Sequence, residues 1–141
     1  MRSPIAGLIP RATDRPVVDV GLAADRLIQA YNAKDFDGMA AMIAADLDFA
    51  HFNRAFVLTS RDALLDVLRD FASQYVPDRH FEAPERVTVA GNIVVREAWY
   101  AGTAAIDLPG FGAKGEAFRL KFCSVMRFDA DGILVEWKDH G

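Results

Sequence analysis

The sequence has little of what several common protein classes need. It has one cysteine, Cys123, in 141 residues, so the chain cannot form an internal disulfide. It has no run of lysine or arginine and a formal net charge of −4, which disfavours nucleic-acid binding. No apolar stretch approaches the roughly 20 residues of a membrane span, and the short, proline-interrupted apolar piece near the start is too weak for a signal peptide. We therefore expect a soluble cytoplasmic protein with no nucleic-acid or membrane partner.

The spacings that mark common cofactor sites are also missing. No group of His, Cys, Asp and Glu residues has the spacing of a metal site. The glycine-rich stretch 107–115 lacks the spacing of a P-loop, and no Ser or Thr follows Lys114. We expect a protein that works without a metal or another cofactor.

Apolar residues, in contrast, are abundant. They make up 52% of the chain and include ten phenylalanines, enough for a core and for wide apolar walls. The length suits one domain. Residues 1–17 are rich in Pro, Gly and Arg and lack periodicity. We therefore predict an irregular N-terminal arm followed by a single domain over residues 18–141.

The period of the apolar residues changes along the chain. Spacings of three and four residues predict three helices, over about residues 18–33, 36–44 and 61–74, with a short strand at 47–52. Two-residue alternation then predicts long antiparallel strands over residues 81–89, 93–105, 118–128 and 133–140. This order is typical of an α+β fold, in which helices pack on one face of a curved antiparallel sheet.

The last predicted strand carries a carboxylate on its apolar face. Asp139 has the same parity as Ile133, Val135 and Trp137. Such a carboxylate either reaches solvent at the end of the strand or lies in a pocket, where burial raises its pKa and makes it a usable base. Both alternatives stay open at this point. By the same parity, we expect the pocket walls to include Phe122, Met126, Val135 and Trp137.

Four stretches occur in an order and spacing that are typical of one superfamily. They are YNAKDFDGMAAMIAADLDF, SRDALLDVL, WYAGT and VMRFDADGILVEWKD. Over about residues 20–139 the chain resembles the nuclear transport factor 2-like superfamily, which includes SnoaL-like polyketide cyclases, limonene-epoxide hydrolases and ketosteroid isomerases. This resemblance implies a cone-shaped barrel, with three N-terminal helices packed in the concave face of a strongly curved antiparallel sheet. It implies a pocket but not one reaction, because the fold serves many activities.

The resemblance to the epoxide hydrolases of this fold can be followed residue by residue. Where these enzymes hold and activate a water, this chain has His51 and Asn53 on the first strand and Trp137 and Asp139 on the last. The resemblance therefore implies Asp139 as the catalytic base, with His51 and Asn53 as helpers. The aspartate that protonates the opening epoxide corresponds to Ala98 in this chain.

The ketosteroid isomerases of this fold offer a second comparison. Their base lies near the position of His51, whose near-neutral intrinsic pKa suits proton transfer, and their buried acidic donor lies near Ser124. The alternative for Asn53 is an amide that only satisfies the backbone of a loop. The alternative for His51 is an inert, hydrogen-bonded histidine at the rim of the pocket. Protonated His51 and Tyr100 are the candidate proton donors.

Other polar and aromatic side chains are candidates for substrate binding. Arg96 and Tyr100 share strand parity with Ala98, so Tyr100 is expected to line the pocket and Arg96 to bind an anionic substrate group or pair with Asp139. An ordinary arginine on the sheet surface is the alternative for Arg96, and Tyr31 is interpreted as a core residue. The full set of expected substrate-binding residues is Arg96, Tyr100, Phe122, Met126, Val135 and Trp137.

The sequence supports three functional hypotheses. The first is an enzyme that catalyses cofactor-free acid–base chemistry, by hydrolysis, isomerisation or cyclisation, on a small hydrophobic metabolite. The second is a pocket that binds such a molecule without catalysis, and the third is a dimeric assembly module. We also expect a homodimer, because the outer face of the sheet carries apolar residues that should be covered. These residues are Val95, Trp99, Cys123 and Val125.

Overall fold

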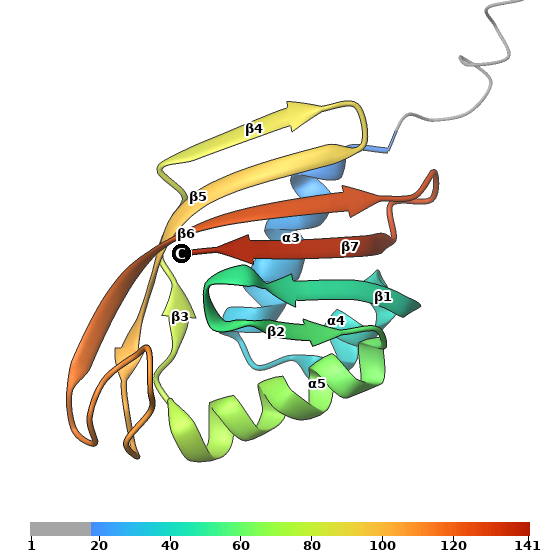
Figure 1. Cartoon of the computed structure of the whole chain (residues 1–141). Coiled ribbons are helices and arrows are strands. Elements are labelled where there is room, and N and C mark those ends of the chain that lie inside the picture. The colour runs from blue at the N-terminus through green and yellow to red at the C-terminus, as the bar shows by residue number, and fades with distance from the viewer. Residues whose placement is uncertain (1–17) are drawn as a thin grey trace, which may run out of the picture.

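The computed structural model describes residues 18–141, which form an α+β fold of three helices and one sheet (Figure 1). The arm predicted for residues 1–17 lies outside the described residues. Each helix begins at a side chain that caps it: Asp19, Asp35 and Ser60 each accept a hydrogen bond from the backbone N–H three residues ahead. None of these helices is long and apolar enough to cross a membrane. They are α3 (Val20–Asn32), α4 (Phe36–Met42) and α5 (Arg61–Asp70).

The seven strands form one open sheet in the order β2-β1-β7-β6-β5-β3, and β4 also pairs with β5. The prediction of an antiparallel sheet is wrong for one pair, because β1 and β7 run parallel. The last strand thereby lies between β1 and β6, near the middle of the sheet. The strands are β1 (Ile43–His51), β2 (Phe56–Leu58), β3 (His80–Phe81), β4 (Arg86–Ala90), β5 (Ile93–Thr103), β6 (Ala117–Phe128) and β7 (Leu134–His140).

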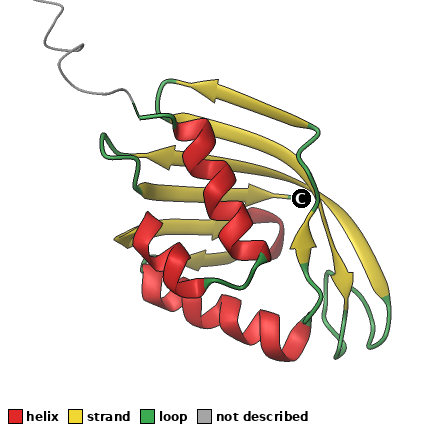
Figure 2. Ribbon diagram, turned by 180° about the vertical axis from the view of Figure 1, so that it is seen from behind, coloured by secondary structure: helices red, strands yellow, loops and turns green. Residues whose placement is uncertain are grey.

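The helices cover one side of the sheet. Helix α3 crosses the face formed by the long strands, while α4 and α5 lie at the end where β1 and β2 are found (Figure 2). Strands β5 and β6 bend strongly along their length, so the covered face is concave (Figure 1). The core lies between the helices and this face. Its most deeply buried side chains are Ala24, Leu27, Met39, Leu47, Val76, Val94, Met126 and Leu134, all of which are fully enclosed.

Local features interrupt two predicted elements. The third helix does not run uniformly to residue 74, because α5 passes into a π-helical turn at Phe71–Tyr75. The strand predicted for residues 81–89 is divided into β3 and β4, which pair with separate parts of β5. Pro84 lies in the gap, where its missing N–H costs no ladder hydrogen bond. The short strand β2 is not predicted by the apolar pattern.

A bulge changes which side chains of the last strand face inward. Phe128 pairs with Leu134, but the neighbouring Arg127 pairs with Glu136, so Val135 is an extra residue opposite β6. Leu134 and Trp137 are therefore both buried, although simple alternation gives them opposite faces. The prediction that Val135 points into the pocket is wrong for this reason.

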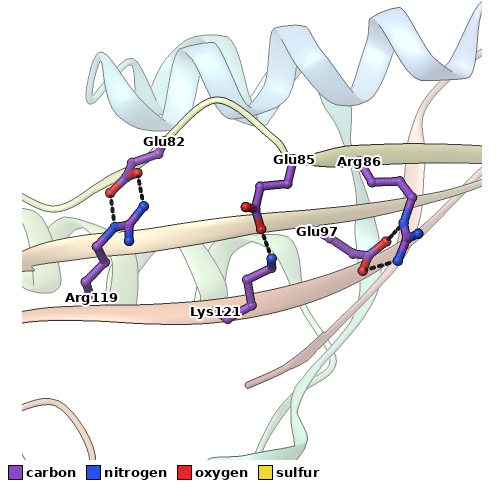
Figure 3. Close-up of polar contacts among 6 residues, drawn as sticks. All are labelled: Glu82, Glu85, Arg86, Glu97, Arg119 and Lys121. Atoms are coloured by element: carbon purple, nitrogen blue, oxygen red, sulfur yellow. Dashed lines mark hydrogen bonds and ion pairs between the residues drawn. The ribbon is translucent and has the colours of Figure 1, made fainter.

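The outer face of the sheet carries ion pairs among its apolar side chains (Figure 3). Arg119 forms two parallel hydrogen bonds with Glu82, at 2.8 Å each, and Lys121 pairs with Glu85. A third pair joins β4 to β5 through Arg86 and Glu97. The guanidinium of Arg119 and the ammonium of Lys121 also lie over the ring of Trp99, at 4.2 and 5.2 Å from its centroid. These charged side chains cover much of the tryptophan that the sequence places on this face.

Candidate active site

A cavity of about 300 Å³ lies between the helices and the concave face of the sheet. Its buried floor and walls combine apolar rings with a few polar groups. These residues are Tyr31, Phe49, His51, Leu64, Phe81, Tyr100, Phe122, Trp137 and Asp139. The partly exposed residues at its mouth come from β2, α5, the π-helical turn, the loop after β5 and the turn after β1. They are Arg54, Phe56, Val67, Leu68, Phe71, Tyr75, Leu108 and Phe111.

Asp139 lies buried at this cavity, with 4% of its surface exposed. Strand pairing places it directly between His51 on β1 and Ser124 on β6. The indole Nε1 of Trp137 donates a hydrogen bond of 2.7 Å to its Oδ1. Burial raises the pKa of Asp139 to about 6, although Ser124, Trp137 and the charge of Arg54 act in the opposite direction. The interpretation of Asp139 as a solvated carboxylate at a strand end is therefore wrong.

His51 shares the cavity but is held in its neutral form. Burial, followed by the nearby charge of Arg54, lowers the pKa of His51 to about 4. Arg54 Nη1 lies 3.4 Å from His51 Nε2, and the ring meets Phe122 edge-on with centroids 4.9 Å apart. The Nδ1 atom is buried and has no hydrogen-bond partner among the described residues. At neutral pH this imidazole can orient a ligand by hydrogen bonding, but it carries no proton to give as an imidazolium.

Two tyrosines form a hydrogen-bonded pair in the wall of the cavity. The hydroxyl oxygens of Tyr31 and Tyr100 are 2.7 Å apart. Burial is the main cause that raises the pKa of Tyr31 to about 12 and the pKa of Tyr100 well above its ordinary value. The ring of Tyr100 stacks on Phe122, with centroids 5.0 Å apart and planes inclined by 18°. Since one hydroxyl donates to the other, one O–H of the pair remains available to a ligand.

Arg54 is a pocket residue that the sequence analysis missed. It ends a 3₁₀ turn at Phe52–Arg54 and donates hydrogen bonds to the carbonyls of Gly110, at 2.9 Å, and Gly141, at 2.5 Å. Its guanidinium lies 4.2 Å from the centroid of the Phe111 ring. These contacts hold the glycine-rich loop against the end of β7. No motif marks this arginine, because its partners are backbone carbonyls from distant segments.

The predicted site residues fall into two groups. The structure brings His51, Tyr100, Phe122, Trp137 and Asp139 together around the cavity, and it adds Tyr31, which the sequence analysis assigned to the core. The remaining predicted residues lie elsewhere and are corrections to the predicted site: Asn53, Arg96, Met126 and Val135 are not among the lining residues.

Three of these corrections have a clear physical cause in the contacts or burial of the residue. Asn53 is exposed, and its side-chain oxygen accepts a hydrogen bond of 2.7 Å from the backbone N–H of Gly141. Arg96 is buried and forms an ion pair of 3.6 Å with Asp25 of α3, so it neither pairs with Asp139 nor lies on the sheet surface. Met126 is fully enclosed in the core instead of the cavity wall.

The donor atoms in residues 18–141 do not gather into a metal site, since no group of three or more His, Cys, Asp or Glu side chains there could hold an ion. The chemistry available at the cavity is that of one carboxyl group, one neutral imidazole and the paired phenols of Tyr31 and Tyr100, with the phenol of Tyr75 and the guanidinium of Arg54 at the mouth.

Comparison with known proteins gives a family match and many matches of fold. The family model described as a SnoaL-like domain matches residues 24–137. A candidate polyketide cyclase from Xanthomonas campestris pv. campestris is similar in structure, with a TM-score of 0.74 and 20% identity over 86% of this chain and 89% of that one. An LEH-like epoxide hydrolase from M. tuberculosis has a TM-score of 0.69 and 19% identity, and the alignment covers 88% of this chain and 83% of that one.

A third similar structure carries a bound small molecule. It is a protein with a ketosteroid isomerase-like fold from Catenulispora acidiphila in complex with trimethylamine, with a TM-score of 0.69 and 14% identity over 89% of this chain and 87% of that one. At these identities the likeness concerns the fold alone. A search of curated proteins gave no match.

Proposed function

The chain belongs to the SnoaL-like domain family, and from this premise we propose that it is an enzyme that performs acid–base chemistry on a small, largely apolar molecule. The position of Asp139 carries the proposal. This carboxyl group is 4% exposed, borders an apolar cavity of about 300 Å³ and has a pKa of about 6. A carboxylate that is partly protonated near neutral pH is a stronger base than an exposed one. The reactions that suit this site are hydrolysis, isomerisation and cyclisation.

Asp139 acts as the base in this proposal. In an isomerisation or cyclisation, its carboxylate removes a proton from a carbon next to the carbonyl group of the substrate. In a hydrolysis, it removes a proton from a water that attacks the substrate. The hydrogen bond from Trp137 Nε1 fixes the orientation of the carboxylate. It also prevents the pKa of Asp139 from rising further, so the ionised form is available at neutral pH.

The Tyr31–Tyr100 pair acts as the proton donor. Of the two donors that the sequence suggested, protonated His51 is disfavoured, because its pKa of about 4 leaves it neutral at pH 7. The phenols remain protonated, and their mutual hydrogen bond of 2.7 Å strengthens the free O–H as a donor. This O–H stabilises the negative charge that develops on the substrate oxygen when Asp139 takes a proton. In this chain Ala98 stands at the position of the proton-donating acid of the epoxide hydrolases. We assign the role of that acid to the two tyrosines.

The proposal is tested with Asp139→Asn and a panel of small epoxides, lactones and enones. The variant is expected to fold and to lose about 10²–10⁴-fold in rate on any substrate that the wild type turns over. Ser124→Ala is a matched control, because it removes a contact of the same carboxyl group but leaves the base in place. Equal turnover by wild type and Asp139→Asn contradicts the assignment of the base.

A second candidate function is binding without catalysis. The observation that favours it is that Asp139 already has a hydrogen bond from Trp137, and that the remaining walls of the cavity are almost wholly apolar. A hydrophobic metabolite held there would travel with the protein through purification. Native mass spectrometry of the purified protein, before and after solvent extraction, distinguishes such a carried ligand from an empty cavity.

We also propose that the protein forms a homodimer through the outer face of the sheet. The four expected contact residues, Val95, Trp99, Cys123 and Val125, are all partly exposed. The ion pairs in Figure 3 lie among these residues, because Glu97, the partner of Arg86, stands between Val95 and Trp99 on β5 and opposite Cys123 on β6. Charged pairs inside an interface can fix the orientation of the two partners. Sedimentation at micromolar concentration is expected to give twice the chain mass, and Val125→Glu is expected to give a monomer. A monomeric wild type contradicts the proposal.

A further inference from the structure

A buried arginine behind the tyrosine pair has no acidic partner among residues 18–141. Arg79 is 1% exposed, and within residues 18–141 its guanidinium makes one hydrogen bond, from Nη2 to the carbonyl of Tyr31 at 2.7 Å. Its Nε and Nη1 atoms are buried without a hydrogen-bond partner, and no carboxylate among the described residues lies within ion-pair distance. A buried charge without a counterion is costly, so its position calls for an explanation.

The guanidinium is placed against the group that is proposed to donate a proton. It lies over the ring of Tyr31, 4.0 Å from the centroid. The hydroxyl of this tyrosine is 2.7 Å from the hydroxyl of Tyr100, and both rings line the cavity. Arg79 itself does not line the cavity. A positive charge therefore lies behind the tyrosine pair. The ring of Tyr31 separates this charge from the cavity, where a ligand oxygen would accept a hydrogen bond from the free hydroxyl.

We propose that Arg79 is a positioning residue that stabilises negative charge at the Tyr31–Tyr100 hydroxyls, so that the cavity prefers ligands with an acidic hydroxyl, such as enols and phenols, to their neutral ethers. This inference rests on the proposed function, since it deepens the role of the tyrosine pair there. The ligand supplies the negative charge that no described residue places within ion-pair distance of Arg79. The stabilisation by Arg79 increases as the ligand oxygen becomes more negative. In an enolisation this oxygen gains negative charge at the transition state, so the same charge would favour the reaction.

Other charged groups act on the same hydroxyls and must be separated from Arg79. Asp139 raises the pKa of both tyrosines when it is ionised, whereas Arg79 lowers the pKa of both. Arg54 at the mouth of the cavity is a second cation in the field of Tyr100 and Asp139. The test is therefore made on the Asp139→Asn background, where the carboxylate no longer titrates and Arg54 is the same in all variants.

A purely structural role for Arg79 is the alternative. The hydrogen bond to Tyr31 ties the C-terminal end of α3 to the segment before β3. Asn32 ties the same end of α3 to β3 itself, without charge: its Nδ2 donates to the carbonyl of Phe81, and its Oδ1 accepts from the N–H of Phe81, both at 2.9 Å. Asn32→Ala is therefore a matched control that loosens this junction and leaves the charge of Arg79 in place.

The experiment measures the pKa of 4-nitrophenol bound to the Asp139→Asn protein, by the visible absorbance of its phenolate at excess protein. Arg79→Met removes a charge that acts across one tyrosine ring, at an effective dielectric constant of about 20. We expect the preference for phenolate over phenol to fall by roughly tenfold or more. This change raises the pKa of the bound probe by about one pH unit or more. Arg79→Lys and Asn32→Ala are expected to leave that pKa within a few tenths of a unit. Binding of 4-nitroanisole, which cannot ionise, is expected to be the same in all variants.

The result that overturns the inference is an unchanged probe pKa in Arg79→Met, an equal shift in Asn32→Ala, or no binding of nitrophenol at all. If Arg79→Met does not fold, the variants Arg79→Lys and Tyr31→Phe are compared instead. The inference is supported if Arg79→Lys keeps the preference for phenolate over phenol and Tyr31→Phe loses it. It is contradicted if Tyr31→Phe keeps this preference. Catalysis is not needed for this titration. Failure of the proposed function, seen as equal turnover by Asp139→Asn, is thus distinguishable from failure of the role of Arg79.

Discussion

Replacing Asp139 by Asn should make the folded protein more stable at neutral pH. Burial raises the pKa of this carboxyl group from 3.8 to about 6, so the folded protein holds a proton that the unfolded chain releases between these two pH values. The contribution of this group to stability is therefore complete below about pH 4 and is lost as the pH rises through about 6. Asparagine does not ionise, and its amide oxygen can still accept the hydrogen bond from Trp137.

The size of the effect follows from the shift in pKa. A rise of about 2 pH units corresponds to about 3 kcal/mol of unfolding free energy, which the wild type loses between acid and neutral pH. Asp139→Asn escapes this loss. For a domain of 141 residues, a gain of this size raises the melting temperature by roughly 10 °C at pH 7 to 8. At pH 4 the two proteins should differ little.

The assay is urea unfolding of both proteins at several pH values between 4 and 8, followed by circular dichroism. Other groups titrate equally in the two proteins, so only the difference between their unfolding free energies is interpreted. This difference should grow from near zero at pH 4 to its full value above pH 7. A difference that stays constant over this range means that Asp139 titrates like an exposed carboxyl group. The proposed base then has no raised pKa, and the reasoning is refuted.

Three further predictions concern the same cavity. Trp137→Phe removes a hydrogen bond that lowers the pKa of Asp139, so the pH midpoint of activity should rise by roughly one unit, and an unchanged midpoint contradicts this role. His51→Gln removes a group whose pKa is lowered from 6.5 to about 4, so the variant should lose less unfolding free energy than wild type on acidification between these values, as followed by urea unfolding. Val67→Trp should fill the mouth of the cavity and abolish binding of a hydrophobic dye, while the exposed neighbour variant Asp66→Trp should bind it normally.

The sequence predicts the sheet well where its two faces differ sharply. On β6 the alternation correctly places Phe118, Phe122, Ser124 and Met126 on the concave side, because each outward neighbour is charged or partly exposed. Asp139 was likewise identified as a carboxylate with an apolar face around it. These successes rest on local period alone.

The errors arise where contacts between distant segments override that period. The bulge that turns Val135 outward depends on how β7 pairs with β6, and alternation along one strand does not reveal it. Strand parity suggests that Arg96 binds substrate or pairs with Asp139, but its partner is Asp25, on a helix 71 positions away in the chain. Only the packing of α3 on the sheet reveals this ion pair. Arg54 and Arg79 act through backbone carbonyls and aromatic rings, which leave no recognisable spacing in the sequence.

The central position of β7 bears on how the chain folds as it is made. Strands β1 and β6 both precede β7 in the chain, and each leaves an unpaired edge until β7 enters between them. Open edges of this kind are templates for pairing with other nascent chains. Asp139 lies on β7, so the carboxylate that lowers stability at neutral pH is carried into place only after both neighbouring strands have been made. Substitutions that disturb this strand are therefore expected to reduce the yield of folded protein during synthesis, even where the finished molecule tolerates them.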